Sequence, residues 1–341
     1  MITIYDVAKK AGVSPSTVSR VLNKYDNVTE KTRIKVIKAC NDLNFIPNAN
    51  ASNLKKRTTR TLALFIPDIE NPFFTSVLKG FEGKAFKSGY NTIVCDTDEN
   101  FELEKSYTQM VLEKRIDGVA VSTISRTKEH LEKIVSRKIP LVLIDRKIKD
   151  FNVDIVCGDS TQGARDLVRH LLEQGYSKIA MIIASQHLST SRERIEGYKS
   201  VLREARIDIN HSYIKVDKEN DGYSREAAYQ MTKELLTECQ ESDRPDSIFA
   251  GNNLMALGVY QAVREMGLKV PEEMAIVCFD NLNLTYEIEP FFTAAVQPAY
   301  TMGMMAADIL INRIEENYEG NVQQVILKPD IEIRKSSLGG D

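Results

Sequence analysis

Polar side chains follow several short apolar runs of the sequence, at the positions where buried strands would end. They are Asp68 after LFIP, Asp96 after IVC, Ser122 after GVAV, Asp145 and Arg146 after LVLI, and Asp280 and Asn281 after AIVCF. Aspartate accepts hydrogen bonds, arginine donates as many as five, and asparagine does both, so such a set suits a ligand with several hydroxyl groups. These residue types therefore predict a small-molecule binding site.

Other residues that could carry catalysis show no suitable spacing. The sequence has no glycine-rich phosphate loop and no dinucleotide-binding pattern. Its four histidines have neither metal-ligand spacing nor a paired nucleophile: His130, His170, His187 and His211. The five cysteines are scattered, mostly in apolar runs, which indicates buried thiols in a reducing cytoplasm. We therefore expect a protein that is not an enzyme and that needs no metal or cofactor.

Alternating strands and helices must position the polar residues. Seven apolar runs are predicted as strands: TLALFI (61–66), TIVC (92–95), GVAVS (118–122), LVLID (141–145), IAMIIA (179–184), SIFAG (247–251) and AIVCFD (275–280). Helices fit the intervening segments, such as Ser76–Lys87, Glu102–Lys114 and Lys128–Arg137. This alternation predicts parallel sheets whose strands are buried on both faces. Two such sets predict two lobes, near 61–161 and 162–290, with the polar residues in the cleft between them.

The charge is unevenly distributed along the chain. Residues 1–60 contain twelve Lys or Arg and four Asp or Glu, a net charge of +8, which leaves −11 for the other 281 residues of a chain with a net charge of −3. A basic N-terminal segment on an acidic remainder indicates that residues 1–60 (the head) bind a polyanion. A basic surface that is only solvated is the alternative.

The basic head predicts a helix-turn-helix. A first helix is expected at about Ile4–Ala11, followed by a turn at Gly12. Ser14 and Pro15 suit the start of a second helix. That helix would bury Val18, Val21 and Leu22 and leave Ser16, Thr17, Ser19 and Arg20 facing outward, where they could contact a major groove. A third helix at about 29–43 is expected to bury Ile34, Ile37 and Cys40 or their neighbours. A small helical bundle with a polar surface is the alternative.

Residues 3–23, TIYDVAKKAGVSPSTVSRVLN, closely resemble the DNA-binding headpiece of the lactose/galactose repressor (LacI/GalR) family of bacterial regulators. Residues 43–56, LNFIPNANASNLKK, resemble the end of that headpiece and its hinge, and the resemblance continues through the whole chain. It implies a small all-α helix-turn-helix headpiece at 1–47, a hinge helix or linker at 48–60, and an α/β two-lobed domain like the periplasmic binding proteins at 61–341. This last domain would bind the effector and form the dimer, through two parallel sheets. The lobe next to the hinge (the near lobe) would span about 61–161 and 292–321, and the far lobe about 162–291 and 322–341, with three crossovers between them.

The resemblance also implies which headpiece and hinge residues contact DNA. They are Thr3, Tyr5, Ser14, Ser16, Thr17, Ser19, Arg20, Asn23, Asn27, Asn48, Leu54 and Lys55. Leu54 stands where the family has a leucine that wedges into the minor groove, and wedges of this kind kink the duplex. The hinge departs from the common pattern at Asn50 and Asn53, which are poor helix formers.

Several stretches of the body resemble the ribose-binding members of the same superfamily: NPFF (71–74), IDR (144–146), RERIEGY (192–198), FAGNNLMALG (249–258), CFD (278–280) and VQP (296–298). Carried over residue by residue, the resemblance implies an effector site made of Asn71, Phe73, Phe74, Asp145, Arg146, Arg194, Asn252, Asp280 and Gln297. The aromatic rings would cover the apolar face of a sugar, and the polar groups would bond its hydroxyls. Asn253 replaces an acidic residue that is usual in the family, and no conclusion about the ligand follows from it.

The resemblance implies a cytoplasmic, nucleoid-associated homodimer that regulates transcription, most often by repression. A small sugar between the lobes would change its affinity for a near-palindromic, double-stranded operator. A sugar acid is an open alternative, because Arg146, Arg192 and Arg194 could together hold a carboxylate. A protein co-repressor is another.

The body alone would also fit a transport-type sugar-binding protein. The headpiece and the lack of an apolar signal core argue against that class. No apolar run is long enough to cross a bilayer, so no membrane partner is expected, and the absence of terminal leucine heptads gives no reason to expect a tetramer.

Overall fold

The structure, a computed structural model, describes residues 2–22, 27–45, 58–218, 222–282, 291–316 and 320–338. Its internal contacts divide the chain into two compact units, Met1–Thr59 and Arg60–Asp341. Among the helices of these described ranges, none has both the length and the apolar character that a membrane span requires.

Three helices form the first unit: α1 (Ile4–Ala11), α2 (Pro15–Leu22) and α3 (Glu30–Asp42). Asp6 fixes the start of α1, because its carboxylate accepts hydrogen bonds from the backbone N–H and the hydroxyl of Thr3. Gly12 ends α1 with a φ of 67°, and the Ser14 hydroxyl accepts the Thr17 N–H at the start of α2. The first two helices and their turn therefore match the prediction.

The core of the headpiece differs from the prediction on the third helix. The buried side chains are Val7, Ala8, Val18, Val21, Val36, Ala39 and Cys40. Of the residues predicted on the third helix, Cys40 is buried, whereas Ile34 and Ile37 are 59 % and 47 % exposed and their neighbours Val36 and Ala39 are buried in their place. The core-facing stripe of α3 passes through Val36, Ala39 and Cys40 at i, i+3 and i+4, and the two isoleucines lie outside it.

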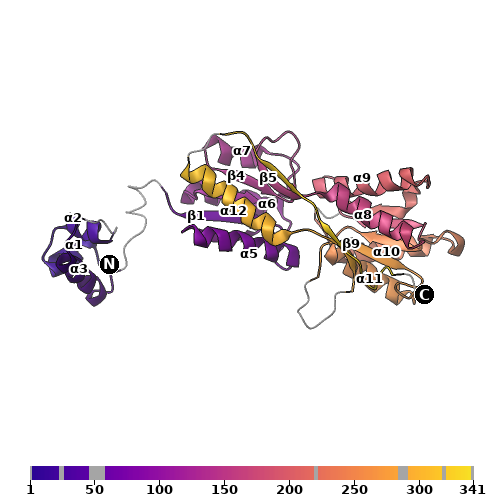
Figure 1. The fold of residues 1–341 in the computed structure, drawn as a ribbon, viewed down its shortest axis with the longest axis horizontal. Coiled ribbons are helices and arrows are strands. Elements are labelled where there is room, and N and C mark those ends of the chain that lie inside the picture. The colour runs from indigo at the N-terminus through magenta and orange to yellow at the C-terminus, as the bar shows by residue number, and fades with distance from the viewer. Residues whose placement is uncertain are drawn as a thin grey trace. The chain divides into compact units, whose positions relative to one another are not determined.

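The near lobe contains a parallel six-stranded sheet in the order β11-β5-β4-β3-β1-β2. Its strands are β1 (Thr61–Ile66), β2 (Asn91–Asp96), β3 (Gly118–Val121), β4 (Leu141–Ile144), β5 (Asp154–Gly158) and β11 (Gln324–Leu327). Helices α5 (Pro72–Lys87) and α12 (Ala299–Glu315) lie side by side on one face (Figure 1). Helices α6 (Phe101–Lys114) and α7 (Glu129–Ser136) cover the other.

The far lobe repeats this architecture with the strand order β12-β10-β9-β8-β6-β7. Its strands are β6 (Ile179–Ile183), β7 (Ile214–Val216), β8 (Ser247–Ala250), β9 (Ala275–Phe279), β10 (Thr293–Val296) and β12 (Asp330–Glu332). Helices α8 (Ser160–Glu173) and α9 (Ser189–Glu204) cover one face, and α10 (Arg225–Glu238) and α11 (Asn253–Glu265) the other. Two short 3₁₀ turns complete it, η1 (His211–Tyr213) and η2 (Glu241–Asp243). β12 runs antiparallel to β10, so the sheet is mostly rather than wholly parallel.

The chain passes between the lobes three times. It leaves the near sheet after β5, returns between β10 and α12, and leaves again between β11 and β12. The predicted lobe limits at 292 and 321 differ from this pairing, because β10 (293–296) belongs to the far sheet and β11 (324–327) to the near sheet. Both crossings therefore come several residues later than expected.

Burial of the strands follows their place in each sheet. The central strands β3, β4, β6, β8 and β9 are buried throughout, as their unbroken apolar sequences predict. β2 is an edge strand and leaves Ile93 and Val94 partly exposed, contrary to the expected burial on both faces.

Two glycines allow α5 and α12 to approach closely. A Cβ atom at Gly80 would lie 1.9 Å from the Tyr300 carbonyl oxygen, and one at Gly303 would lie 1.9 Å from that of Val77. The two helices, which are far apart in sequence, are thus held backbone to backbone on the near sheet.

Candidate functional site

The headpiece presents a polar surface along α2 (Pro15–Leu22). The side chains of Ser16 and Arg20 are exposed, and those of Thr17 and Ser19 are half-buried. The Ser14 hydroxyl lies 2.7 Å from that of Ser16 and 2.9 Å from that of Thr17. These groups extend from the first to the last turn of α2 and can hydrogen-bond bases or phosphates in a major groove.

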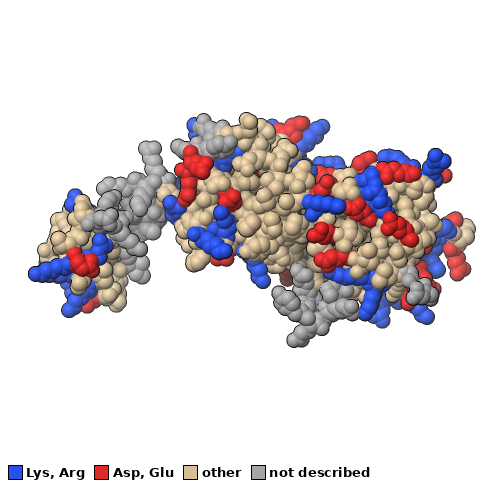
Figure 2. All heavy atoms as spheres, viewed as in Figure 1, with Lys and Arg blue, Asp and Glu red and all other residues tan. Residues whose placement is uncertain are grey.

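Other predicted DNA-contact residues are exposed elsewhere on the headpiece or lie outside the described ranges. Thr3 and Asn27 are exposed, and Tyr5 is 70 % exposed despite its large ring. The charged residues on the visible face of this unit are mostly Lys and Arg (Figure 2), a sign that suits a phosphate backbone. Outside the described residues are Asn23, Asn48, Leu54 and Lys55.

A second candidate site lies in the cleft between the lobes of the body. Its lining residues are Asp68, Asn71, Phe73, Phe74, Glu99, Asp145, Arg146, Arg194, Tyr223, Asn252, Leu254 and Asp280. Eight of the nine residues predicted for the effector site are among them. The ninth, Gln297, is buried beside them and bonds Asp280. The structure thus brings the predicted set together, and its role in binding remains a prediction.

Helix starts position the amide and aromatic residues of the cleft. Asn71 caps α5 by accepting the Phe73 N–H at 3.0 Å, and Asn252 caps α11 by accepting the Met255 N–H at 2.9 Å. The Phe73 and Phe74 rings meet edge to face with centroids 4.9 Å apart. Capping therefore fixes an amide at the rim of each lobe, with aromatic rings beside the one in the near lobe.

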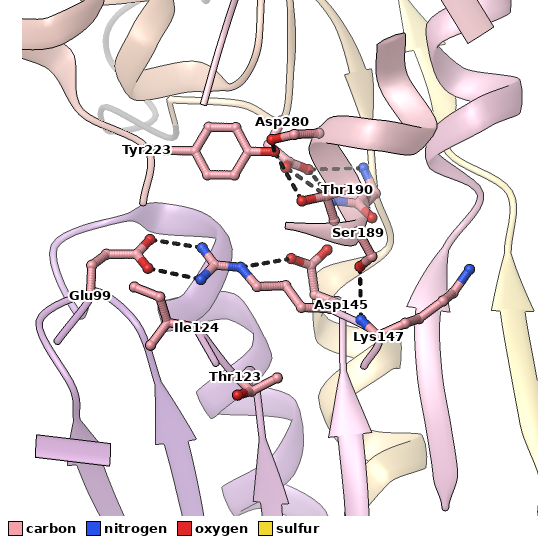
Figure 3. A network of polar contacts seen from close by, with 12 residues as sticks. Glu99, Thr123, Ile124, Asp145, Lys147, Ser189, Thr190, Tyr223 and Asp280 are labelled. Atoms are coloured by element: carbon pink, nitrogen blue, oxygen red, sulfur yellow. Dashed lines mark hydrogen bonds and ion pairs between the residues drawn. The ribbon is translucent and has the colours of Figure 1, made fainter. Parts of the chain in front are cut away.

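Asp145 and Asp280 occupy equivalent positions in the two lobes. Asp145 follows β4 with a φ of 64°, and Asp280 follows β9 with a φ of 62°. Such left-handed conformations are uncommon outside glycine, although aspartate tolerates them better than most residues. Each turn directs a buried carboxylate from the end of a strand into the cleft, as Figure 3 shows.

Burial and neighbouring charges shift the pKa values of these carboxyl groups. Burial raises the pKa of Asp280 to about 7, with further repulsion from Asp145 and an opposing effect of Arg194. Burial also raises the pKa of Asp145, against the attraction of Arg194 and Arg146. Gln297 donates from Nε2 to both Asp280 carboxylate oxygens, at 3.3 and 3.1 Å. At neutral pH this pair of carboxyls can therefore both accept and donate hydrogen bonds.

The Arg146 guanidinium is held by Glu99 in a two-bond arrangement (Figure 3). Its Nη1 and Nη2 groups donate to the two Glu99 carboxylate oxygens at 2.8 and 2.7 Å. The Arg146 side chain is only 2 % exposed. Burial alone would lower its pKa, but the Glu99 carboxylate outweighs that effect and the net pKa is raised.

Arg194 reaches the cleft from α9 in the far lobe. Its Nη1 donates to the Gly251 carbonyl oxygen at 2.7 Å and to the Tyr223 hydroxyl at 3.1 Å. Its guanidinium carbon lies 3.9 Å from the centroid of the Phe279 ring, a cation–π contact. Arg192 points elsewhere: it is exposed and bonds the carbonyls of Gln186 and His187. The prediction that Arg192 joins the other arginines in the cleft was therefore wrong, because neighbouring positions on a helix face different directions.

Three buried polar atoms of the cleft lining, and one of the neighbouring Gln297, have no hydrogen-bond partner within the described residues. They are Asp145 Oδ1, Arg146 Nε, Arg194 Nε and Gln297 Oε1. Most buried polar atoms in proteins are hydrogen-bonded, so a cluster of exceptions indicates a ligand site. Two of these atoms are acceptors and two are donors, and they come from both lobes and a crossover. A molecule with several hydroxyl groups could bond all of them.

Direct contacts hold the two lobes together across the cleft. Asn253 donates to Asn71 Oδ1 at 3.1 Å, and Lys147 pairs with Glu193 at 2.7 Å. The Lys147 N–H also donates to the Ser189 hydroxyl at 2.8 Å (Figure 3). The cavity between the lobes is about 20 Å³, room for roughly one water molecule. A sugar therefore requires the lobes to move apart.

Sequence reasoning missed Glu99, Tyr223 and Leu254 of the cleft lining, and the bond that Asn253 makes across the cleft. Glu99 follows the predicted strand end at Asp96, which was a usable signal, but its pairing with Arg146 depends on a turn with no sequence signature. Tyr223 follows the unpredicted strand β7. Asn253 was noticed only as a departure from the family pattern, and it bonds the opposite lobe.

Comparisons with known proteins cover both units of the chain. Residues 3–48 match the family described as "Bacterial regulatory proteins, lacI family", and residues 168–337 match the "Periplasmic binding protein-like domain". The "HTH-type transcriptional repressor PurR" of Photobacterium profundum is 33 % identical over 339 residues, 98 % of each chain. The repressor of the same name from Haemophilus influenzae is 34 % identical over 340 residues, again 98 % of each.

Solved structures with the same architecture include sugar complexes. A LacI family transcriptional regulator from Enterococcus faecium with bound ribose is 27 % identical, covers 82 % of this chain and 100 % of its own, and has a TM-score of 0.71. The complex of the transcriptional regulator CelR with cellobiose is 25 % identical, covers 98 % and 100 %, and has a TM-score of 0.73. The lac repressor dimer bound to operator and the anti-inducer ONPF has a TM-score of 0.83 at 24 % identity, covering 99 % of each chain, a likeness of fold.

Proposed function

Because the chain belongs to the lacI family of bacterial regulatory proteins, we propose that a small sugar bound between its two lobes controls its affinity for DNA. In keeping with its relatives, the chain is a DNA-binding transcriptional repressor under ligand control and not an enzyme. The proposal of a sugar goes further than these relatives do. It is supported by the four unpartnered donor and acceptor atoms of the cleft lining and the neighbouring Gln297, and by the ribose and cellobiose complexes of similar regulators.

The headpiece residues supply the proposed DNA contacts. Helix α2, with the exposed Ser16 and Arg20 and the half-buried Thr17, would enter the major groove of each half-site. Arg20 could donate two hydrogen bonds to a guanine, and the serine and threonine hydroxyls would bond phosphates or bases. Asn23, Asn48, Leu54 and Lys55 keep the roles that the family resemblance implies, with Leu54 as a minor-groove wedge.

A homodimer on a near-palindromic operator is the proposed assembly. Exposed apolar side chains on the near lobe support it: Phe86 on α5, Ile93 and Val94 on the edge strand β2, and Tyr300 and Met304 on α12. The visible face around α5 and α12 carries few charged residues (Figure 2). Apolar patches of this kind commonly mark protein interfaces. Sedimentation of the DNA complex tests this, since a single copy on the duplex would contradict it.

The lobes provide the proposed coupling between sugar and DNA. A ligand that bonds both Asp145 and Arg194 would bind one arrangement of the lobes better than another, and only such a difference can shift their equilibrium. Each near lobe follows its hinge directly in sequence, so the spacing of two near lobes would decide whether both copies of Leu54 can reach one minor groove. We propose that the repressor acts in the cytoplasm, at the nucleoid.

Replacement of Arg194 tests this function. A thermal-shift screen against sugars would first find the effector, since a ligand at 100 times its Kd adds roughly 2.7 kcal/mol of stability. Arg194→Ala should then weaken effector binding at least tenfold in calorimetry, because charged hydrogen bonds contribute about 1.5–3 kcal/mol. DNA binding without effector should survive. Arg192→Ala, on the exposed side of the same helix, is the matched control. Unchanged affinity in Arg194→Ala would mean that the sugar lies elsewhere.

A further inference from the structure

We infer that Glu99 makes the cleft selective for uncharged sugars, so that a neutral sugar binds and the corresponding sugar acid is rejected. This inference rests on the proposed function and concerns the chemical class of the ligand. It also addresses the alternative that arginines in the cleft hold a ligand carboxylate.

The first argument is that Glu99 already occupies the arginine site that an anionic ligand would need. A carboxylate binds arginine best through two parallel N–H···O bonds. Arg146 makes that arrangement with Glu99, at 2.8 and 2.7 Å, and with its side chain almost fully buried. Its Nε lies 4.0 Å from Asp145 Oδ2. A sugar acid would have to displace Glu99 and leave that carboxylate close to its own.

Arg194 is also partly engaged by groups of its own lobe. Its Nη1 is shared between the Gly251 carbonyl oxygen and the Tyr223 hydroxyl, and its guanidinium packs on the Phe279 ring. Lys147, close to the cleft, pairs with Glu193 at 2.7 Å. The Nε of Arg194 has no hydrogen-bond partner within the described residues and could donate to a ligand oxygen.

The second argument is the charge of the cleft lining. The lining contains four carboxyl groups, on Asp68, Glu99, Asp145 and Asp280, and two guanidinium groups, on Arg146 and Arg194. If all are ionised, the carboxylates are in excess. If Asp145 and Asp280 both keep their protons, the two remaining carboxylates still balance the two cations. In neither state does the lining carry a surplus positive charge that would compensate the desolvation of an anion.

The third argument is that Glu99 is fixed in place from both lobes. Asp98 and Glu99 both have a φ of 48°, an uncommon conformation for residues other than glycine, and the Glu99 N–H is bonded to the Pro67 carbonyl at 2.8 Å. On the far side, a Cβ atom at Gly222 would lie 2.2 Å from the Glu99 carboxyl carbon. The glycine thus leaves room for the carboxylate against the opposite lobe. In this closed arrangement Glu99 therefore has little room to move away from Arg146, and when the lobes move apart its backbone bond to Pro67 still holds it in the near lobe.

Glu99→Gln tests the inference, because it removes the charge and keeps the shape. Binding is measured by calorimetry at constant pH and ionic strength with four matched pairs: ribose and ribonate, xylose and xylonate, glucose and gluconate, galactose and galactonate. In the wild type, at least one neutral sugar should bind, at least tenfold more tightly than its acid. Glu99→Gln should reduce that ratio at least tenfold, chiefly by gaining affinity for the acid. Glu102→Gln, an exposed carboxylate on α6, should leave the ratio unchanged.

The outcomes separate this inference from the proposed function. Equal wild-type affinity for a sugar and its acid would overturn it, and this comparison holds even if the variant does not fold. An unchanged ratio in a folded Glu99→Gln would also overturn it, while leaving sugar control intact. If no member of any pair binds although operator binding persists, both the inference and the sugar part of the proposed function are wrong.

Discussion

Replacing Asp280 by asparagine should change how the stability of the protein depends on pH. The Asp280 side chain is buried, and its pKa is raised from 3.8 to about 7, first by burial and then by repulsion from Asp145, despite the attraction of Arg194. The folded chain therefore holds a proton that the unfolded chain releases above about pH 4. The stabilising contribution of Asp280 is complete below that pH and is lost as the pH rises towards and through 7.

The size of the effect follows from the shift. One pKa unit corresponds to 1.36 kcal/mol, so a shift of about three units amounts to roughly 4 kcal/mol in total, with a slope of at most about 1.4 kcal/mol per pH unit. Asparagine has no titrating proton and keeps the shape of the side chain. The difference in free energy of unfolding, wild type minus Asp280→Asn, should therefore fall by about 1 kcal/mol per unit between pH 5 and 7 and level off above pH 8.

Urea unfolding between pH 5 and 8.5 provides the measurement. The sequence has no tryptophan, so circular dichroism is the suitable signal. Asp208→Asn, an exposed carboxylate of the far lobe, controls for the loss of a charge. Asp145→Asn should move the Asp280 transition to lower pH, because it removes the repulsion from Asp145. A stability difference that stays constant across this range would refute the reasoning and mean that Asp280 is ionised throughout.

Three further changes test other parts of the molecule. Arg20→Ala should cost about 1–3 kcal/mol on the preferred duplex in fluorescence anisotropy. An equal loss on random duplex would indicate a phosphate contact only. Leu54→Ala should reduce duplex bending in gel-shift assays while the thermal stability of the free protein stays unchanged, whereas a large loss of stability would place Leu54 in a core. Gly303→Ala would put a methyl group 1.9 Å from the Val77 carbonyl oxygen and should destabilise the protein by about 1–3 kcal/mol in urea unfolding. Wild-type stability in that variant would show that α5 and α12 separate without cost.

The sequence predicts the central strands best, because their apolar runs are unbroken. β1 occupies the predicted residues Thr61–Ile66, and β6, β8 and β9 end within one residue of their predicted limits. The strands β5, β7, β10, β11 and β12 were not predicted. β7 and β12 have three residues each, and β11 alternates between exposed and half-buried positions, so none has the apolar run that marks a buried strand.

Strand ends and family motifs were sufficient to predict most residues of the cleft lining. Asp145 and Asp280 follow buried strands, and the carboxyl ends of parallel strands meet at one edge of a sheet. The sequence did not predict the ion pair of Glu99 with Arg146 or the hydrogen bond of Asn253 to Asn71. Both depend on tertiary geometry, the first on a left-handed turn and the second on how the lobes close.

The pairing of α5 with α12 has a consequence for the newly synthesised chain. The near lobe is discontinuous: β1 to β5 end at Gly158, whereas α12 begins at Ala299, after most of the far lobe. At synthesis rates of about 5–20 residues per second, α12 is synthesised on the order of ten seconds or more after α5 and the strands on which it packs. During that time Val77, Phe81 and the apolar face of the sheet lack their covering helix, while the far lobe can already assemble most of its strands. The headpiece has its three helices long before then, so the DNA-binding part of this repressor can fold before the lobe that would bring two copies together.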